Sequence, residues 1–214
     1  MSEPVPSLHL LNGYHFWEWF SSHHSNYLLL DDREEDEIDH LLNELLQRLH
    51  QYCDQLYFKI GARDTAIKEF IITAEGNAEY FDKAEDLVKM APKLKGWKII
   101  ALSPPDEDMD EIISYDGLEL NPETIWFIPL DNKSEPHKFG IRVCLDEYDP
   151  AEDEKFFYAV NYLLEKLLGE KGNALDIQYM EVSNLPTEPD EGVLFNLEDL
   201  PSYIDFRKTQ VELN

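Results

Sequence analysis

The chain has 214 residues, enough for one large domain or two small ones. Hydrophobic residues make up 43% of it, sufficient for a substantial core, and 45 acidic residues against 18 lysines and arginines give a formal net charge of −27. This charge disfavours binding to nucleic acids and to anionic membrane surfaces, whereas it favours solubility or docking onto a basic protein. The sequence shows neither a basic leader before an apolar run nor a stretch of about twenty apolar residues, so we expect a cytoplasmic protein.

A pair of helices is predicted within residues 15–53. Asn12-Gly13 is typical of a turn, and aromatic residues then recur at three- and four-residue steps over residues 15–27. Residues 31–53 have leucines at helical spacing and acidic residues at the amino end, where they favour the helix dipole.

The order strand-strand-helix-strand is then predicted twice, at about 55–104 and about 124–186, which suggests an internal repeat. Between the two lies an acidic loop with a turn at Asp116-Gly117, and a short helix is expected over residues 196–208. The expected elements are strands 55–61 and 68–76, helix 77–91 and strand 96–105, then strands 124–130 and 137–146, helix 149–172 with Gly169 near its end, and strand 174–186.

The fold class predicted from this order is α+β, with residues 1–214 as a single domain that contains two sub-repeats. The strands would form one antiparallel-rich mixed sheet or two packed sheets, and the helices would cover one face. The predicted core is Phe20, Leu42, Leu45, Leu49, Phe58, Ile72, Leu87, Ile99, Phe127, Ile141, Val143, Leu163, Leu167 and Ile177.

The stretch FWEWFSSHHSNYLLL, residues 16–30, contains a histidine pair beside Glu18 and resembles a catalytic or metal site at first sight. His23 and His24 are adjacent, however, and neighbouring side chains on a helix point about 100° apart, so the two cannot hold one ion from one face. We interpret the stretch as an aromatic docking helix. Trp17 and Trp19 cannot both face inward, so one of them would contact another surface or a partner.

Other motifs of catalysis are missing from the sequence: it has no G-x-S-x-G, no phosphate-binding loop and no dinucleotide fingerprint. Cys53 and Cys144 lack a CxxC partner and are expected to be buried free thiols. Asp149 is expected to cap a helix that Pro150 begins, rather than to bind a metal. We therefore expect no cofactor, no metal and no catalytic residue.

Three segments, FWEWF, APKLKGWKIIALSPP and LLEKLLGEKGNALDIQYMEVSNLP, together resemble an uncharacterised family of soluble bacterial proteins seen largely in Bacteroidota. The resemblance covers nearly the whole chain and implies a bacterial cytoplasmic protein without an assigned reaction. In its acidic balance and repeated element order the chain is also similar to regulators of ribonuclease E activity with a ferredoxin-like fold, an analogy of architecture alone.

Three functional hypotheses remain open. The first is a binding, regulatory or immunity-like protein that docks onto a basic partner. The second is an enzyme or small-ligand binder with a cleft between the repeats, and the third is a homodimer joined through a strand edge or the aromatic helix. The candidate partner-binding residues are Asp106, Glu107, Asp108, Asp110, Glu111, Trp17 and Trp19, and the candidate cleft residues are Trp97, Tyr115, Trp126, Arg142 and Glu170.

Overall fold

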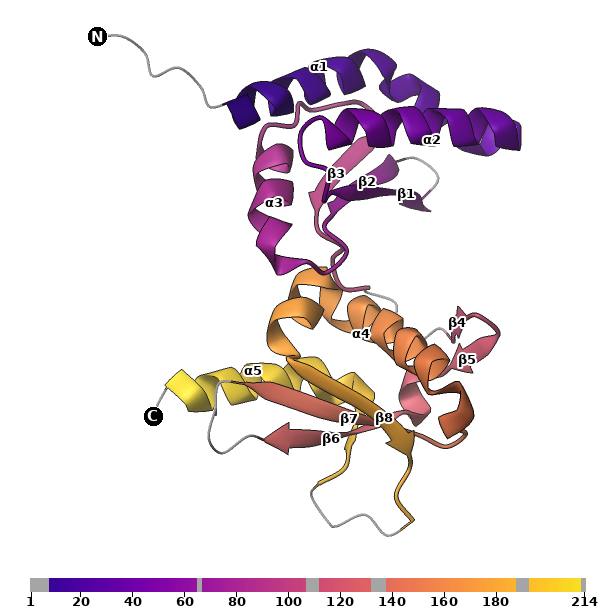
Figure 1. The fold of residues 1–214 in the computed structure, drawn as a ribbon, viewed down its shortest axis with the longest axis vertical. Coiled ribbons are helices and arrows are strands. Elements are labelled where there is room, and N and C mark those ends of the chain that lie inside the picture. The colour runs from indigo at the N-terminus through magenta and orange to yellow at the C-terminus, as the bar shows by residue number, and fades with distance from the viewer. Residues whose placement is uncertain (1–7, 65–66, 107–111, 132–137, 188–192, 213–214) are drawn as a thin grey trace. The chain divides into compact units, whose positions relative to one another are not determined.

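The computed structural model describes residues 8–64, 67–106, 112–131, 138–187 and 193–212, and it is an α+β protein, as the sequence predicts (Figure 1). The chain divides into two compact units, Met1–Ser103 and Pro104–Asn214. The strand-strand-helix-strand segments predicted at about 55–104 and 124–186 lie in different units, and each unit has its own sheet.

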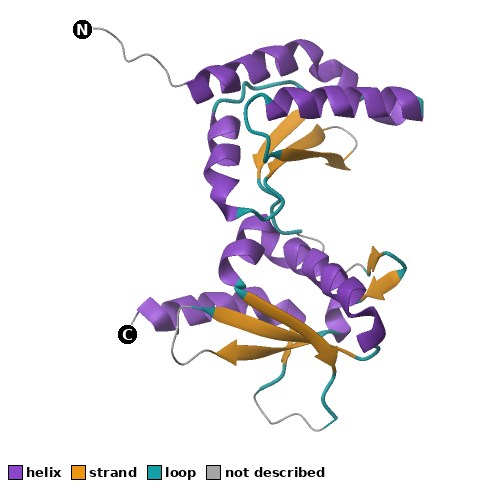
Figure 2. Ribbon diagram, in the orientation of Figure 1, coloured by secondary structure: helices purple, strands orange, loops and turns teal. Residues whose placement is uncertain are grey.

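The first unit consists of a helical pair followed by a three-stranded sheet with one crossover helix (Figure 2). The sheet has the order β1-β2-β3, in which β1 and β2 are antiparallel and β2 and β3 are parallel. The elements are α1 (Leu8–Leu28), α2 (Glu35–His50), β1 (Tyr57–Asp64), β2 (Ile67–Thr73), α3 (Phe81–Lys89) and β3 (Trp97–Ala101).

The helices of the first unit pack on one face of its sheet. Phe70 and Ile72 on β2 are fully buried, and the Phe70 ring stacks on Phe20 of α1 with the centroids 4.6 Å apart. Alternate strand residues point to opposite faces, so Glu69 and Ile71 point away from α1. This arrangement confirms that the helices cover one face of the sheet.

The expected turn at Asn12-Gly13 is wrong, because α1 continues through both residues. A Cβ atom on Gly13 would lie 2.4 Å from Met90 Cε, so glycine permits a close approach at this point of the helix. The Asn12 side chain donates a hydrogen bond to the Gln51 carbonyl just after α2. Tertiary packing therefore outweighs the local turn preference of the pair.

The second unit has a four-stranded sheet of order β8-β7-β6-β9 and a separate two-stranded hairpin. Strands β6 and β7 are antiparallel, and β7 and β8 are parallel across the crossover helix α4, which is the arrangement of the first unit. The elements are β4 (Ile113–Tyr115), β5 (Leu118–Leu120), β6 (Trp126–Asp131), β7 (Phe139–Leu145), α4 (Asp153–Asp176), β8 (Tyr179–Asn184), β9 (Phe195–Asn196) and α5 (Leu200–Glu212).

Two local features of the second unit differ from expectation. The turn at Asp116-Gly117 is confirmed, with φ of 45° and 77°, but it joins the short strands β4 and β5, which the sequence analysis did not predict. Helix α4 does not end near Gly169. It kinks there, because Gly169 has φ 72° and ψ 164°, and it then continues to Asp176.

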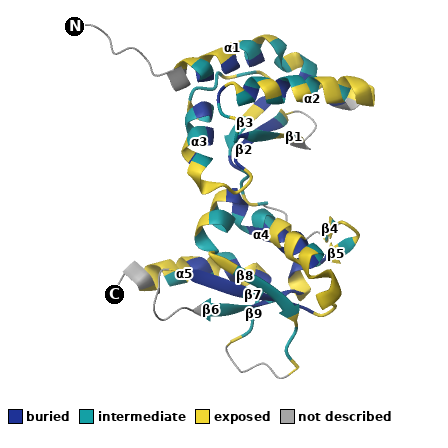
Figure 3. Cartoon of the chain, viewed as in Figure 1, coloured by how far each residue is buried: buried dark blue, intermediate teal, exposed yellow. Residues whose placement is uncertain are grey.

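Both α4 and α5 pack on the same face of the second sheet. Phe127, Ile141 and Val143 are fully buried in a core that includes residues of both helices, such as Leu163 and Leu200. Figure 3 shows in dark blue the buried residues along β7. The opposite face carries the alternate residues, as in the first unit. Of the predicted core residues, ten are buried, and the four that are partly exposed are Leu42, Phe58, Ile99 and Ile177.

Within the described ranges, none of the helices combines the length and the apolar content needed to cross a bilayer.

Candidate functional site

The aromatic helix α1 is mostly a core element of the first unit. Trp17 is 3% exposed, and its indole N–H donates a hydrogen bond to the Leu87 carbonyl at 2.7 Å. The prediction that Trp17 binds a partner is therefore corrected, because its side chain is buried in the first unit. Trp19 is half-buried, stacks on His23 and lies 5.4 Å from the Arg48 guanidinium carbon. As predicted, the two tryptophans do not share one orientation.

The histidine pair has structural contacts. His23 Nδ1 is 2.8 Å from the Trp19 carbonyl oxygen, and His24 Nδ1 accepts a hydrogen bond from the Trp97 indole at 3.2 Å. In the part of the chain that the structure describes, no three His, Cys, Asp or Glu side chains gather in a way that could hold a metal ion.

The acidic run at 106–111 lies largely outside the described residues, which include only Asp106 from it; Glu107, Asp108, Asp110 and Glu111 are not described. The Asp106 carboxylate forms an ion pair with Lys166 Nζ at 2.8 Å, and the Asp106 backbone N–H donates a hydrogen bond to the Lys166 carbonyl at 2.7 Å. Its carboxylate thus anchors the chain to α4 within the second unit.

The five candidate cleft residues do not form one site, and three of them occupy separate environments. Trp97 belongs to β3 of the first unit, is 8% exposed and is hydrogen-bonded to His24, whereas the other four lie in the second unit. Glu170 is 1% exposed, just beyond the kink in α4. The Tyr115 ring lies 5.7 Å from that of Tyr162.

Trp126 and Arg142 do lie on one surface, the face of the second sheet that points away from α4 and α5. Trp126 pairs with Cys144 across β6 and β7, and Arg142 lies two residues before Cys144 on the same face. This surface is polar at β8 and more apolar at β6, where Ile128 and Leu130 are partly exposed.

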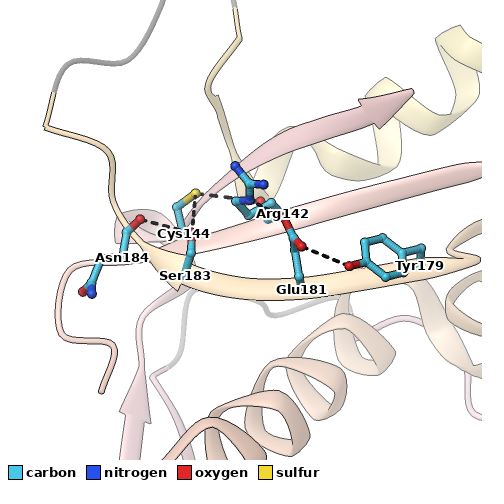
Figure 4. A network of polar contacts seen from close by, with 6 residues as sticks. All are labelled: Arg142, Cys144, Tyr179, Glu181, Ser183 and Asn184. Atoms are coloured by element: carbon cyan, nitrogen blue, oxygen red, sulfur yellow. Dashed lines mark hydrogen bonds and ion pairs between the residues drawn. The ribbon is translucent and has the colours of Figure 1, made fainter. Parts of the chain in front are cut away.

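A chain of polar contacts crosses this face (Figure 4). Arg142 Nε forms an ion pair with Glu181 on β8, and the Tyr179 hydroxyl donates a hydrogen bond to the same carboxylate at 3.0 Å. Cys144 is fully buried with its sulfur 3.7 Å from the Ser183 hydroxyl, and burial raises the pKa of the Cys144 thiol. The thiol is free, as expected, and so is that of Cys53, which is half-buried rather than buried.

A pocket of about 560 Å³ opens in the second unit, between the β5 region and the turn that follows β7. Three carboxylates line it: Glu119 of β5, and Asp146 and Glu147 directly after β7. The rest of the lining includes Leu118, Asn121 and Thr124, and it reaches Ile125 and Phe156, which are buried in the core of the unit. The lining that the structure describes contains no lysine, arginine or histidine. We call this feature the acidic pocket.

The two units differ strongly in charge. Residues 1–103 contain 18 acidic and 10 basic residues, a net charge of −8, whereas residues 104–214 contain 27 acidic and 8 basic residues, a net charge of −19. Residues 112–130 and 143–154, which supply most of the pocket lining, contain no lysine or arginine. Six further exposed acidic residues lie on these two segments: Asp116, Glu123, Asp149, Glu152, Asp153 and Glu154.

Local capping explains part of this concentration. Asp149 accepts a hydrogen bond from the Ala151 N–H, which confirms it as a cap, and the Tyr148 hydroxyl donates to Asp153. Glu119, Asp146 and Glu147 are exposed, and the structure gives their carboxylates no hydrogen bond or ion pair among the residues that it describes. Their charge therefore faces the pocket and solvent.

Glu119, Asp146 and Glu147 are not among the candidate residues named from the sequence. Their grouping depends on the β4–β5 hairpin, which places Glu119 beside residues that follow β7. The signal in the sequence that could have indicated the acidic pocket is the absence of lysine and arginine from residues 112–130 and 143–154.

No protein-family model matches this chain, and comparisons with curated proteins and with solved structures found no match.

Proposed function

We propose that this protein binds a basic protein partner through the acidic pocket and the exposed acidic residues around it, and that it regulates or neutralises that partner. The observation that carries the proposal is the uneven charge: −19 of the net −27 belongs to the second unit. A surface of this kind attracts and orients a basic protein.

The arrangement of the carboxylates supports recognition in addition to general attraction. Glu119, Asp146 and Glu147 line a single concave feature instead of being scattered over a convex surface. They are exposed, and none is paired with another described residue, so a partner's cations would not have to displace an internal ion pair. Concave sites with a few convergent charged groups are typical of binding surfaces.

The experiment compares two variants of equal net charge. One, E119Q/D146N/E147Q, neutralises the acidic pocket. The other, E198Q/D199N/D205N, neutralises three exposed acidic residues of the same unit, on the short 3-10 helix Leu197–Asp199 and on α5. Each variant is used to retain partners from a lysate at low and at high salt, and the affinity for a retained protein is then measured after its purification.

We expect the pocket variant to lose affinity by about tenfold or more and the matched control by less than about threefold, with binding of the wild type declining as salt rises. Equal losses in the two variants would mean that net charge alone acts. The proposal fails if the wild type retains no basic protein even at low salt.

A further inference from the structure

We infer that the outer face of α4, which points away from the core of the second unit, binds an arginine-bearing segment of the partner, with a guanidinium group stacked on Tyr158. The inference deepens the proposed function and rests on it only in taking the partner to be basic. It adds a second contact surface, which is separate from the lining of the acidic pocket, and it names the side chain that this surface recognises.

Aromatic residues lie on the side of α4 that faces away from its own core. Up to the kink at Gly169, the buried apolar side chains of this helix are those of Phe156, Ala159, Val160, Leu163, Leu164 and Leu167. At 100° per residue, Tyr158 lies almost directly opposite them, and Tyr162 follows one turn later. The two side chains are 51% and 36% exposed. The outer face of an amphipathic helix is normally polar, so packing within the unit does not account for these two rings.

The two rings belong to a continuous exposed surface. The ring centroids of Phe157 and Tyr158 are 6.0 Å apart, and those of Tyr115 and Tyr162 are 5.7 Å apart. Tyr158 and Tyr162 are neighbours on the helix surface and join the two pairs. We call these four residues the aromatic patch. Exposed patches of this kind are typical of protein interfaces, in which tyrosine and arginine supply much of the binding energy.

Carboxylates lie beside the centre of the aromatic patch. Glu154 precedes Tyr158 by one turn, and both line a groove of about 390 Å³ whose lining also includes Glu152 and Lys155. Two carboxylates against one ammonium leave this groove negative. Among the residues that the structure describes, Tyr158 has a ring contact only with Phe157. An aromatic face and a carboxylate are therefore presented together to solvent.

This combination matches the chemistry of arginine. A guanidinium group is planar and weakly hydrated, so it can stack on an aromatic face while it donates hydrogen bonds to a carboxylate, which the more strongly hydrated ammonium of lysine does less well. Lys166 Nζ lies 5.6 Å from the Tyr162 ring centroid, so one ring of the aromatic patch already holds a cation. Tyr158 is the ring that remains for the cation of a partner.

Charge also decides against a second copy of this chain as the occupant. Both units of every copy are acidic, with net charges of −8 and −19. Association of two copies through α4 would bring like charges together, and such contacts are unfavourable. The aromatic patch therefore fits a basic protein.

The test measures the affinity of the full chain at low salt, by fluorescence anisotropy, for two peptides of equal charge: one of alternating arginine and glycine, and one of alternating lysine and glycine. Tyr158→Ala removes the central ring without a change of charge, and Tyr158→Leu substitutes an apolar side chain without an aromatic face. Tyr179→Ala is the matched control, because Tyr179 is an exposed tyrosine of the same unit on the sheet face that points away from α4.

We expect the wild type to bind the arginine peptide at least about threefold more tightly than the lysine peptide. Tyr158→Ala and Tyr158→Leu should each weaken binding of the arginine peptide by about fivefold or more, and Tyr179→Ala by less than about twofold. Equal affinities of the wild type for the two peptides, or full affinity of Tyr158→Leu, would overturn the inference and leave the proposed function in place.

The variant E119Q/D146N/E147Q separates the inference from the proposed function. If this variant binds the arginine peptide as tightly as the wild type while Tyr158→Ala binds weakly, the inference is supported and the acidic pocket fails as the docking site. If the wild type binds neither peptide at low salt, both fail. A wild-type dimer in sedimentation that Tyr158→Ala dissociates would identify a second copy as the occupant and overturn the inference.

A measurement on the wild type covers the case in which the Tyr158 variants do not fold. The ring resonances of Tyr158 should shift when the arginine peptide is added, and those of Tyr179 should stay in place, because only Tyr158 belongs to the outer face of α4. Unchanged Tyr158 resonances at saturation would overturn the inference.

Discussion

Arg142 on β7 and Glu181 on β8 are register partners across the parallel strand pair of the second unit, and Glu69 on β2 and Lys98 on β3 hold the corresponding position in the first. The order of the charges is reversed between the units. In each case the pair lies on the sheet face that points away from the helices. A cross-strand ion pair at this position favours the correct register of the two strands.

The two ion pairs should differ in their effect on stability, because the side chain of Glu69 is 11% exposed and that of Glu181 is 32% exposed. We expect Lys98→Met to lower the free energy of unfolding by about 1–3 kcal/mol, since it takes the cation from a mostly buried carboxylate. Arg142→Met should lower it by less than about 1 kcal/mol, because Glu181 is more hydrated and retains its hydrogen bond from Tyr179. Urea denaturation of the two variants measures the difference; equal losses would contradict it.

The two tryptophans of α1 provide a second prediction. Trp17→Ala should lower the free energy of unfolding by about 3–5 kcal/mol, because it removes a buried ring and leaves the Leu87 carbonyl without its indole donor. Trp19→Ala should lower the free energy of unfolding by less, because Trp19 is half-buried and its indole N–H has no hydrogen bond to a described residue that must be broken. Guanidinium denaturation followed by circular dichroism compares the two. A larger loss for Trp19 would show that α1 packs differently.

The order of the helices and strands could be predicted, because the spacing of apolar residues and the residues that end helices and strands are local signals. The change of period after residue 54 and the acidic start of α2 locate strands and helices without knowledge of the fold. Asn12-Gly13 shows where local signals fail: a turn preference is weak compared with a helix whose glycine allows close contact with Met90. At Gly169 the backbone does leave the helical conformation, but a further helical stretch follows at once and continues to Asp176, which the local signal did not predict.

The acidic pocket was harder to predict because it depends on long-range placement. The whole β6–β7 hairpin separates Glu119 from Asp146 in the sequence, and the two residues line one pocket only once the second unit is folded. In contrast, the divergence of His23 and His24 could be predicted, since adjacent helical residues point apart whatever the fold; His23 contacts the Trp19 carbonyl and His24 the Trp97 indole. Geometry within one helix can be read from spacing, whereas a site built from distant loops needs the tertiary structure.

The kink in α4 provides a third prediction. Gly169 has φ 72° and ψ 164°, a conformation that residues with a Cβ atom rarely adopt, so Gly169→Ala should lower the free energy of unfolding by about 1–3 kcal/mol. Gly61→Ala is the matched control, because an added Cβ there meets nothing within 4 Å and no positive φ is required. Thermal unfolding of the two variants should show a clear loss only for Gly169. Equal melting temperatures would indicate that α4 can straighten at little cost.

Two buried tyrosines should make the first unit sensitive to alkali. Burial raises the pKa of Tyr27 from 10.0 to about 12. The nearby negative charge of Glu44 adds to this increase in pKa, and the positive charge of Arg48 opposes it. Burial, followed by the charge of Asp86, raises the pKa of Tyr52 as well. Below pH 10 the phenols are protonated in both folded and unfolded chains, so their contribution to stability is fully present there.

As the pH rises above 10, the unfolded chain loses these protons first, and the free energy of unfolding falls until the folded-state pKa is passed. We therefore expect the wild type to lose stability between pH 10 and about 12, and Tyr27→Phe to lose less of it over the same interval, because phenylalanine has no proton to release. Urea denaturation at a series of pH values measures both slopes. The Tyr14→Phe variant serves as the control, because it makes the same chemical change at a side chain that is 57% exposed. Parallel curves for wild type and Tyr27→Phe would show that ionisation of Tyr27 does not drive the alkaline loss.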